Sequence, residues 1–279
     1  MDKDKVKGML WGLIVGDAFG SPIQFLSKDN HPWITEMVPC PVFHLPAGYW
    51  TDDGSMAMCI MDSFVRKGGY DLQDIGNTFV KWRDQGYLSS IDGLAFDIGN
   101  ATYDAISAIK RGSLANGEES SQGNGSIMRF APSYLIGKWA DERGLQSASV
   151  VMHEVSDLTH RSARVRKVVD RFSAILDEHL AGRRTTAVST YATRDEVNNS
   201  GWAVSTLEAA LWAFNTTASF EDGLVAAVNL GGDADSIGAV YGQVAGAYYG
   251  FNAIPGRWVK AIKTWTMVDK LIEDFLAAV

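Results

Sequence analysis

Two short acidic segments carry the residue types in this chain that are best suited to chemistry. They are Thr51-Asp52-Asp53 and Asp233-Ala234-Asp235-Ser236. Each segment joins two carboxylates to a hydroxyl residue and precedes a stretch with helical spacing. Taken singly, each is typical of an ordinary helix start, because Thr and Asp are favoured N-cap residues. A helix cap needs only one side-chain oxygen. Two helix starts that each carry an additional carboxylate therefore indicate a function beyond capping.

If the two helix starts converge, the four aspartates of these segments share a small volume. At an effective dielectric near 20, each close pair of carboxylates repels by roughly 4 kcal/mol at about 4 Å. Two divalent cations would offset this repulsion, and oxygen donors without His or Cys favour hard ions such as Mg²⁺ or Mn²⁺. Two such ions can hold diol or phosphate oxygens and polarise a water molecule. The segments therefore suggest a metal-dependent hydrolase, and a phosphohydrolase is one class they allow.

Three other features are weaker signals. The small-residue stretch from Ser120 to Arg129 precedes a predicted helix, and such loops expose backbone amides to anions. A plain linker between helices is the alternative interpretation. His160 is predicted at a helix start and Asp97 is a candidate N-cap, and single residues of these types are more often structural.

The composition is that of an ordinary globular protein. Hydrophobic residues make up 46% of the 279 residues and charged residues 21%, with a net charge of −8. The negative charge makes nucleic acid an unlikely partner. Cys40 and Cys59 match no zinc spacing, which favours a reducing cytoplasm. The apolar run from Met9 to Val15 is too short for a membrane span and lacks a signal-peptide cleavage pattern, so we expect no membrane association.

The elements that must position these residues are predicted to be helices. Convincing alternating strands are absent, and the threonine-rich piece from Thr185 to Thr193 is interpreted as a long loop. We therefore predict one all-α domain over residues 1–279, and a monomer. The stretches with helical spacing are Val6 to Phe19, Ser55 to Arg66, Leu72 to Asp84, Ile98 to Lys110, Ile127 to Trp139, Leu145 to Asp157, Ser162 to Leu180, Val204 to Phe214, Phe220 to Asn229, Ser236 to Tyr249 and Met267 to Ala278.

Glycine recurs at every fourth position in two of these stretches. One row is Gly8-Gly12-Gly16-Gly20 and the other is Gly238-Gly242-Gly246-Gly250. Glycine inside a helix costs roughly 1 kcal/mol relative to alanine, so each row needs a packing reason. Close approach of two backbones supplies one. We expect two buried helices, which would also form the scaffold beneath a site.

Taken together, the motifs resemble those of the ADP-ribosylglycohydrolase family, in the family's order and over nearly the whole chain. The matching segments are Gly12 to Gly20, Tyr49 to Asp53, Phe96 to Asn100, Gly123 to Arg129, Leu207 to Phe214 and Asn229 to Ser236. The resemblance implies an orthogonal helical bundle with a dinuclear Mg²⁺ or Mn²⁺ site. It also implies cleavage of the N-glycosidic bond between ADP-ribose and a modified protein side chain, most typically arginine, which releases ADP-ribose.

The resemblance also implies roles for individual residues. Asp97 would orient the guanidinium or assist proton transfer, beside the catalytic acids Asp52, Asp53 and Asp235. The implied metal ligands are Thr51, Asp52, Asp53, Asp233, Asp235 and Ser236. The implied substrate-binding residues are Gln24, Asp97, Asn100, Ser121, Gly123, Asn124, Gly125, Ser126, Met128, His160 and Gly231.

Two positions depart from the family pattern. Many members carry Glu where this chain has Gln24, and in the serine-directed branch that Glu is a key acid near the metals. Gln24 cannot accept a proton there, which weakens a serine linkage more than an arginine linkage. Ser236 stands where Thr is commoner and keeps the hydroxyl. The alternatives left open are another conjugate (O-acetyl-ADP-ribose, serine-linked or nucleobase-linked) and an inactive ADP-ribose-binding or structural relative.

Overall fold

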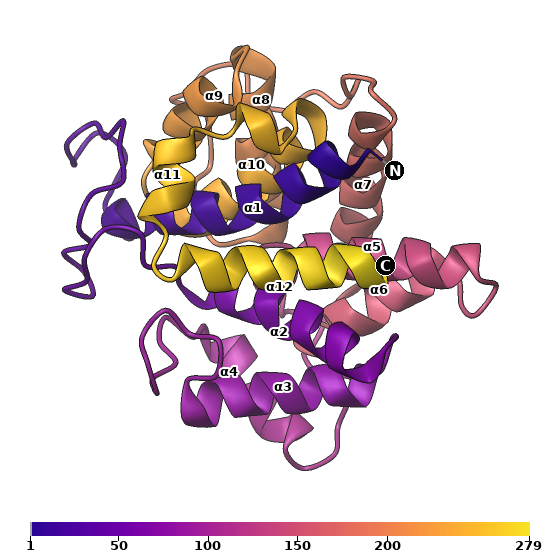
Figure 1. Cartoon of the computed structure of the whole chain (residues 1–279). Helices are drawn as coiled ribbons and strands as arrows, with labels where there is room; N and C mark the ends of the chain where they lie inside the picture. Colours follow the sequence, from indigo (N-terminus) through magenta and orange to yellow (C-terminus); the bar gives the residue numbers. More distant parts are fainter. Residues whose placement is uncertain (1) are drawn as a thin grey trace.

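The structure is a computed structural model that describes residues 2–279. In this range it contains α-helices, two short 3₁₀ helices and isolated β-bridges but no sheet, which confirms the all-α prediction (Figure 1). The α-helices are α1 (Lys3–Gly20), α2 (Asp52–Lys67), α3 (Leu72–Gln85), α4 (Asn100–Ile109), α5 (Phe130–Glu142), α6 (Ala148–Asp157), α7 (Ala163–Leu180), α8 (Ala203–Thr216), α9 (Phe220–Val228), α10 (Ala234–Tyr249), α11 (Gly256–Ala261) and α12 (Trp265–Ala278).

Several helix boundaries differ from the prediction. Helices α4, α5 and α6 begin two or three residues later than the apolar spacing indicated. The N-cap of α4 is Gly99, so the prediction that Asp97 caps this helix is wrong. Asp97 instead has a φ of 61°, a left-handed conformation that cannot continue a helix. Helix α11 was missed because its six residues are too few to show a helical period.

The two glycine rows pack α1 against α10 in antiparallel fashion, and the predicted burial of both helices is confirmed. A Cβ atom on Gly12 would lie 2.1 Å from the carbonyl oxygen of Gly242, and one on Gly16 would lie 2.0 Å from that of Gly238. Only glycine permits so close an approach of the two backbones. The contact sets the C-terminal end of α1 beside the first turn of α10, where Asp233 and Asp235 lie.

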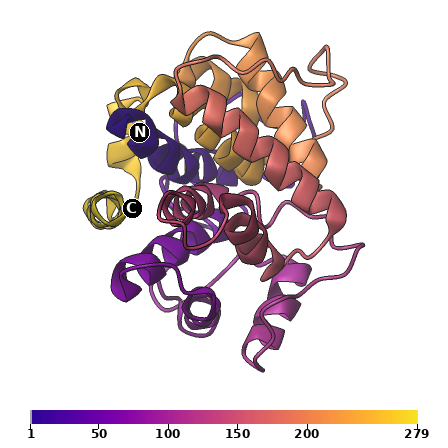
Figure 2. The same cartoon turned by 90° about the vertical axis from the view of Figure 1, so that its right-hand side faces the viewer.

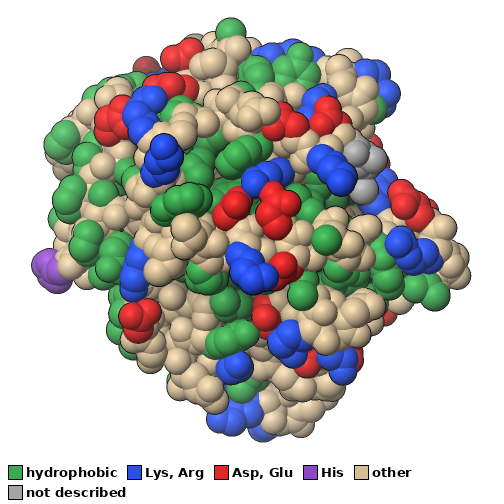
Figure 3. Space-filling view, viewed as in Figure 1, with side chains coloured by type: hydrophobic (Ala, Val, Ile, Leu, Met, Phe, Trp, Pro, Cys, Tyr) green, Lys and Arg blue, Asp and Glu red, His purple; other side chains and the backbone are tan. Residues whose placement is uncertain are grey.

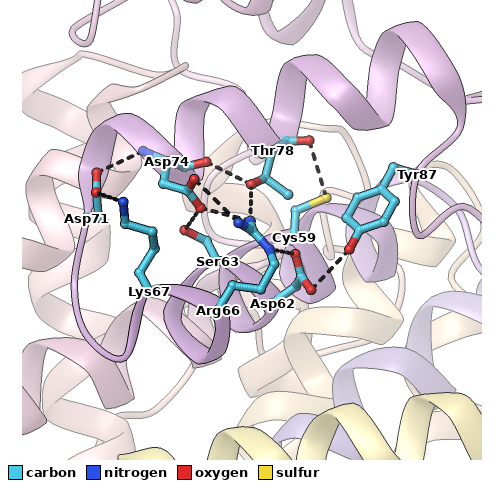
Figure 4. Close-up of polar contacts among 9 residues, drawn as sticks. All are labelled: Cys59, Asp62, Ser63, Arg66, Lys67, Asp71, Asp74, Thr78 and Tyr87. Carbon is cyan, nitrogen blue, oxygen red and sulfur yellow. Dashed lines mark hydrogen bonds and ion pairs between the residues drawn. The ribbon is translucent and has the colours of Figure 1, made fainter.

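Helices α2 and α3 form an antiparallel pair joined by a polar network (Figure 4). Arg66 donates to Asp62 at 2.7 Å, to Asp74 at 2.8 Å and to the Thr78 hydroxyl at 2.9 Å. Helix α2 ends at Gly68, whose φ of 66° is the usual left-handed helix stop. Because Arg66 is half-exposed, these ion pairs contribute modestly to stability. Burial of the apolar face of α2 is the larger contribution.

The core lies between two groups of helices. Figures 1 and 2 show α2 to α4 on one side of the molecule and α8 to α10 on the other, with α1 and α5 between them. The buried apolar side chains form one cluster, whose members range from Val6 in α1 to Phe275 in α12. On the face shown in Figure 3, Lys and Arg side chains are interspersed with Asp and Glu. None of the helices described for residues 2–279 has the length and apolar character required to span a membrane.

Candidate active site

The two acidic segments meet at the starts of α2 and α10. The Thr51 hydroxyl lies 3.3 Å from Asp53 Oδ2 and 3.5 Å from Asp235 Oδ2, a carboxylate of the other segment. Asp52 from the first segment and Asp233 from the second line one cavity of about 420 Å³. The predicted convergence of the two segments is therefore confirmed.

Capping does not account for these acids. Thr51 and Asp233 occupy the N-cap positions of α2 and α10, but neither side chain makes a capping hydrogen bond. The start of α2 is held instead by Asp17 of α1, whose carboxylate accepts from the Thr51 N–H at 2.9 Å and the Gly54 N–H at 2.8 Å. The Thr51 hydroxyl also donates to Asp17 at 2.9 Å. The acids of the two segments are thus surplus to the needs of their helices.

Burial disfavours the charged form of these carboxylates. It is the largest cause that raises the pKa of Asp52, Asp53 and Asp235 well above the usual range, and neighbouring carboxylates raise it further. Burial also raises the pKa of Asp17 to about 7, against the hydrogen bonds from Thr51 and Gly54. The protein alone therefore compensates poorly for the negative charge of these carboxylates.

The donor set fits hard divalent cations. Asp53 Oδ1 and Asp235 Oδ1 are buried without a hydrogen-bond partner, and an orphaned carboxylate oxygen is a free cation ligand. Hydroxyl and carboxylate oxygens are the donors that Mg²⁺ and Mn²⁺ prefer. In the described part of the chain, no group of three or more His, Cys, Asp or Glu side chains is arranged so that it could hold a metal ion without movement. Binding would therefore draw the carboxylates closer together.

Asp97 faces these acids from the connection before α4. It is partly buried, and its Oδ2 accepts a hydrogen bond from the Gln24 amide at 2.9 Å. Burial raises the pKa of Asp97, while this hydrogen bond and one with Asp235 act in the opposite direction. Gln24 is therefore a donor that fixes the Asp97 carboxylate, and a Glu in its place would set two acids face to face.

A glycine loop forms another wall of the cavity. The Asn124 side chain donates to both Asp233 and the Thr206 hydroxyl, the latter at 2.9 Å, and ties the loop to the second acidic segment. A Cβ atom on Gly125 would lie 2.5 Å from the His160 ring. His160 lies between α6 and α7, after α6 ends and before the α7 N-cap, rather than at the helix start itself. Burial, followed by the charge of Arg129, lowers the pKa of His160 to about 3, so its ring is neutral.

Arg129 is a buried cation beneath this loop. It donates to the Gly125 carbonyl oxygen and to the Thr159 hydroxyl, the latter at 2.8 Å. The Thr159 hydroxyl in turn lies 2.8 Å from His160 Nδ1. Although burial lowers its pKa to about 10, Arg129 remains charged at neutral pH. It therefore organises the loop and places a positive charge near Asp52 and Asp53.

Comparison with known proteins identifies the family of this chain. The ADP-ribosylglycohydrolase family model matches residues 1–279. The chain belongs to the ADP-ribosylglycohydrolase family. It is 35% identical to the "ADP-ribosylarginine hydrolase Tri1" of Pseudomonas putida, covering 97% of this chain and 77% of that protein. It is 28% identical to the "ADP-ribosyl-[dinitrogen reductase] glycohydrolase" of Rhodospirillum rubrum, covering 93% of this chain and 90% of that protein.

A solved structure has the same fold. The "ADP-ribosylglycohydrolase-related protein complex" aligns with a TM-score of 0.82 and 31% identity over 99% of this chain and 98% of that chain. The orthogonal bundle expected for an ADP-ribosylglycohydrolase is thus confirmed, as is the assignment of the chain to this family of hydrolases.

Most of the residues predicted for the ADP-ribosylglycohydrolase site line the cavity. They are Gln24, Asp52, Asp97, Asn100, Gly123, Asn124, Gly125, Met128, His160, Asp233, Asp235 and Ser236. Thr51 and Asp53 are buried beneath it.

Besides Thr51 and Asp53, three predicted residues do not line the cavity. The Ser121 hydroxyl accepts from the Glu118 N–H at 3.0 Å and stabilises a turn. Ser126 is buried, with its hydroxyl 2.9 Å from that of Ser156. Gly231 has a φ of 65°, and a Cβ there would meet Leu26 and His31. These positions therefore shape the loops rather than face the cavity.

Several residues of the site were not predicted from the sequence. Those lining the cavity are Phe25, Ile98, Gly99, Ala101, Thr102 and Gly201. Asp17 and Arg129 lie behind the wall. A signal for Asp17 was present, because a lone acid inside an apolar, glycine-rich helix needs a polar partner.

Proposed function

We propose that this chain removes ADP-ribose from a modified protein by hydrolysing the N-glycosidic bond to arginine, with two divalent cations, Mg²⁺ or Mn²⁺. The observation that carries the proposal is the meeting of two acidic segments in one cavity bounded by a glycine loop. The names of the relatives from P. putida and R. rubrum support ADP-ribose as the released group. The first of them also supports arginine as the linked residue.

The carboxylate that the cations would leave free favours a cationic leaving group. Within residues 2–279, the cavity lining contains four Asp residues and neither Lys nor Arg, and Asp97 is the one of the four that is not a proposed cation ligand. A guanidinium pairs well with a carboxylate, whereas a neutral serine hydroxyl gains no charge attraction there. The Gln24 amide next to Asp97 supports the same choice, because it leaves Asp97 as the acceptor available to the guanidinium.

Each part of the site has a separate task. The cations would be held by Thr51, Asp52, Asp53, Asp233, Asp235 and Ser236. When bound, they supply positive charge to the ribose hydroxyls and to the attacking water. Asp97 orients the guanidinium and assists proton transfer, in the position that Gln24 fixes. Backbone amides of the glycine loop, at Gly123 and Gly125, bind the diphosphate, and neutral His160 lines the same wall.

The test is release of ADP-ribose from a panel of conjugates in the presence of Mg²⁺ or Mn²⁺. The panel contains an ADP-ribosylated arginine peptide, an ADP-ribosylated serine peptide and O-acetyl-ADP-ribose. We expect release from the arginine peptide. Asp97→Asn should lower kcat by about a hundredfold, since proton transfer contributes a factor of this order. Asp141→Asn, an exposed aspartate outside the cavity, is the matched control and should match wild type.

Other outcomes identify other activities. Preferential release from serine or acetyl would assign a different linkage, and release of inorganic phosphate would assign a phosphohydrolase. Binding of ADP-ribose without turnover of any conjugate would assign an inactive relative. Equal rates for wild type and Asp97→Asn on the arginine peptide would remove Asp97 from the mechanism.

A further inference from the structure

Phe25 is a strained and exposed aromatic residue at the rim of the cavity. Its side chain is 64% exposed, so it contributes little to the core. Its φ is 64°, in the left-handed region, which is unfavourable for a residue with a Cβ atom. Glycine would fit this turn at no such cost. A bulky residue held in this conformation is a reason to look for a functional use of the ring.

The surrounding contacts place Phe25 near Asp97 and the second acidic segment. Its own N–H donates to the Gly232 carbonyl oxygen at 2.7 Å, one residue before Asp233. The preceding residue, Gln24, donates to Asp97 at 2.9 Å. Phe25 therefore lines the cavity next to Gln24, whose side chain contacts Asp97.

Another part of the cavity lining has a different character. There His160 packs against the glycine loop at Gly123 and Gly125, with Thr102 beside it. This part of the lining offers backbone amides and a neutral ring, which suit the diphosphate and the nucleoside. We therefore assign Phe25 and Asp97 to the group that departs.

The ring and the carboxylate together match the chemistry of one side chain. A guanidinium is planar, accepts a carboxylate along its edge and stacks its face on an aromatic ring. We propose that Phe25 determines specificity by stacking on the guanidinium of the arginine leaving group while Asp97 pairs with its edge. This role rests on the proposed function, because it takes arginine as the linked residue.

The experiment compares ring-deleting and ring-retaining variants on an ADP-ribosylated arginine peptide. Phe25→Leu and Phe25→Gly should each lower kcat/KM about tenfold, the scale of a partly desolvated cation–π contact. Phe25→Tyr keeps the ring and should recover most of the loss. Trp33→Leu is the matched control, since Trp33 is an exposed ring of the same loop that does not line the cavity.

Two further readouts separate this role from a structural one. The dissociation constant of free ADP-ribose should be the same for wild type and Phe25→Leu, because the ring contacts only the leaving group. The unfolding free energy of Phe25→Gly should equal or exceed that of wild type, because the left-handed strain is relieved. Loss of activity without loss of stability is the expected signature.

Three results would overturn the proposed role of Phe25. They are wild-type kcat/KM in Phe25→Leu, failure of Phe25→Tyr to recover activity, and an equal weakening of ADP-ribose binding in Phe25→Leu. The wild type is measured first on the same peptide. No release by wild type would overturn the proposed function and the Phe25 role together, whereas release that is insensitive to Phe25→Leu overturns the Phe25 role alone.

Discussion

At the scale of single residues, Asp17 links the scaffold to the site. Its carboxylate accepts hydrogen bonds from the Thr51 and Gly54 N–H groups. The acids at the start of α2 are therefore not needed to cap the helix. Asp17→Ala would leave these buried donors without a partner, which costs about 1–3 kcal/mol. We therefore expect a lower unfolding free energy and, since Thr51 and Asp53 lose their position, at least about tenfold slower release of ADP-ribose.

A second helix start provides the control for Asp17. Asp71 caps α3 by accepting from the Asp74 N–H at 2.9 Å and does not line the cavity. Asp71→Ala should cost about 1 kcal/mol in a denaturant titration without slowing turnover. Equal turnover in Asp17→Ala and Asp71→Ala would show that Asp17 acts on stability alone.

The sequence predicted these residues to different extents. The acids of the two segments were found because their pattern occurs twice and exceeds what helix capping requires. Asp17 was overlooked because one acid within a helix does not reveal which distant amides it accepts from. The conformations of Phe25 and Asp97 could not be predicted, because a positive φ in a residue other than glycine depends on tertiary contacts such as the Phe25 bond to Gly232.

At the scale of elements, the α1–α10 contact fixes the distance between the acidic segments. Gly12→Ala would set a Cβ about 2 Å from a backbone oxygen of α10, so the helices must separate. Overpacking of this kind costs about 1–3 kcal/mol or more. We expect a lower melting temperature and slower turnover, since the start of α10 moves away from α2.

Gly256→Ala is the matched control for the helix contact. Gly256 lies in α11, and a Cβ there would meet no atom within 4 Å. This substitution should leave turnover unchanged and raise stability slightly, by the difference in helix propensity. If Gly12→Ala melts at the wild-type temperature, the close approach of the two helices is not required.

Helices were predicted correctly where the segment was long enough to show a helical period. The glycine rows predicted the burial of α1 and α10 and a close backbone approach, whereas the pairing of these two helices with each other is shown by the structure. Helix α11 was missed because the six residues between Pro255 and Ile262 are too few to show a helical period. Helices α4 and α5 start later than predicted because the turns before them also contain apolar residues, which were counted as part of the helix.

At the scale of the whole molecule, buried histidine makes stability depend on pH. His179 is buried against Phe214, its Nδ1 lies 2.8 Å from the Val244 carbonyl oxygen, and its Nε2 has no partner. Burial lowers its pKa from 6.5 to about 4. Between these pH values the unfolded chain binds a proton that the folded chain excludes, so stability falls as the pH decreases from 6.5 to 4.

The size of this effect follows from the shift. Each pH unit in that window costs about 1.4 kcal/mol, so about 2 kcal/mol is lost by pH 5. Urea titrations at pH 7 and pH 5 should show a loss of unfolding free energy that is about 2 kcal/mol smaller in His179→Gln than in wild type, because the other titrating groups, His160 among them, are common to both proteins. The same pH dependence in the two proteins would contradict the assignment to His179.

The most direct test of the account is release of ADP-ribose from an ADP-ribosylated arginine peptide after chelation of divalent cations. We expect release to stop in the chelated protein and to return on addition of Mg²⁺ or Mn²⁺. In Asp235→Asn it should not return, because one of the carboxylates proposed to hold the cations is lost. Release at the full rate after chelation, or no release at any cation concentration, would contradict the account.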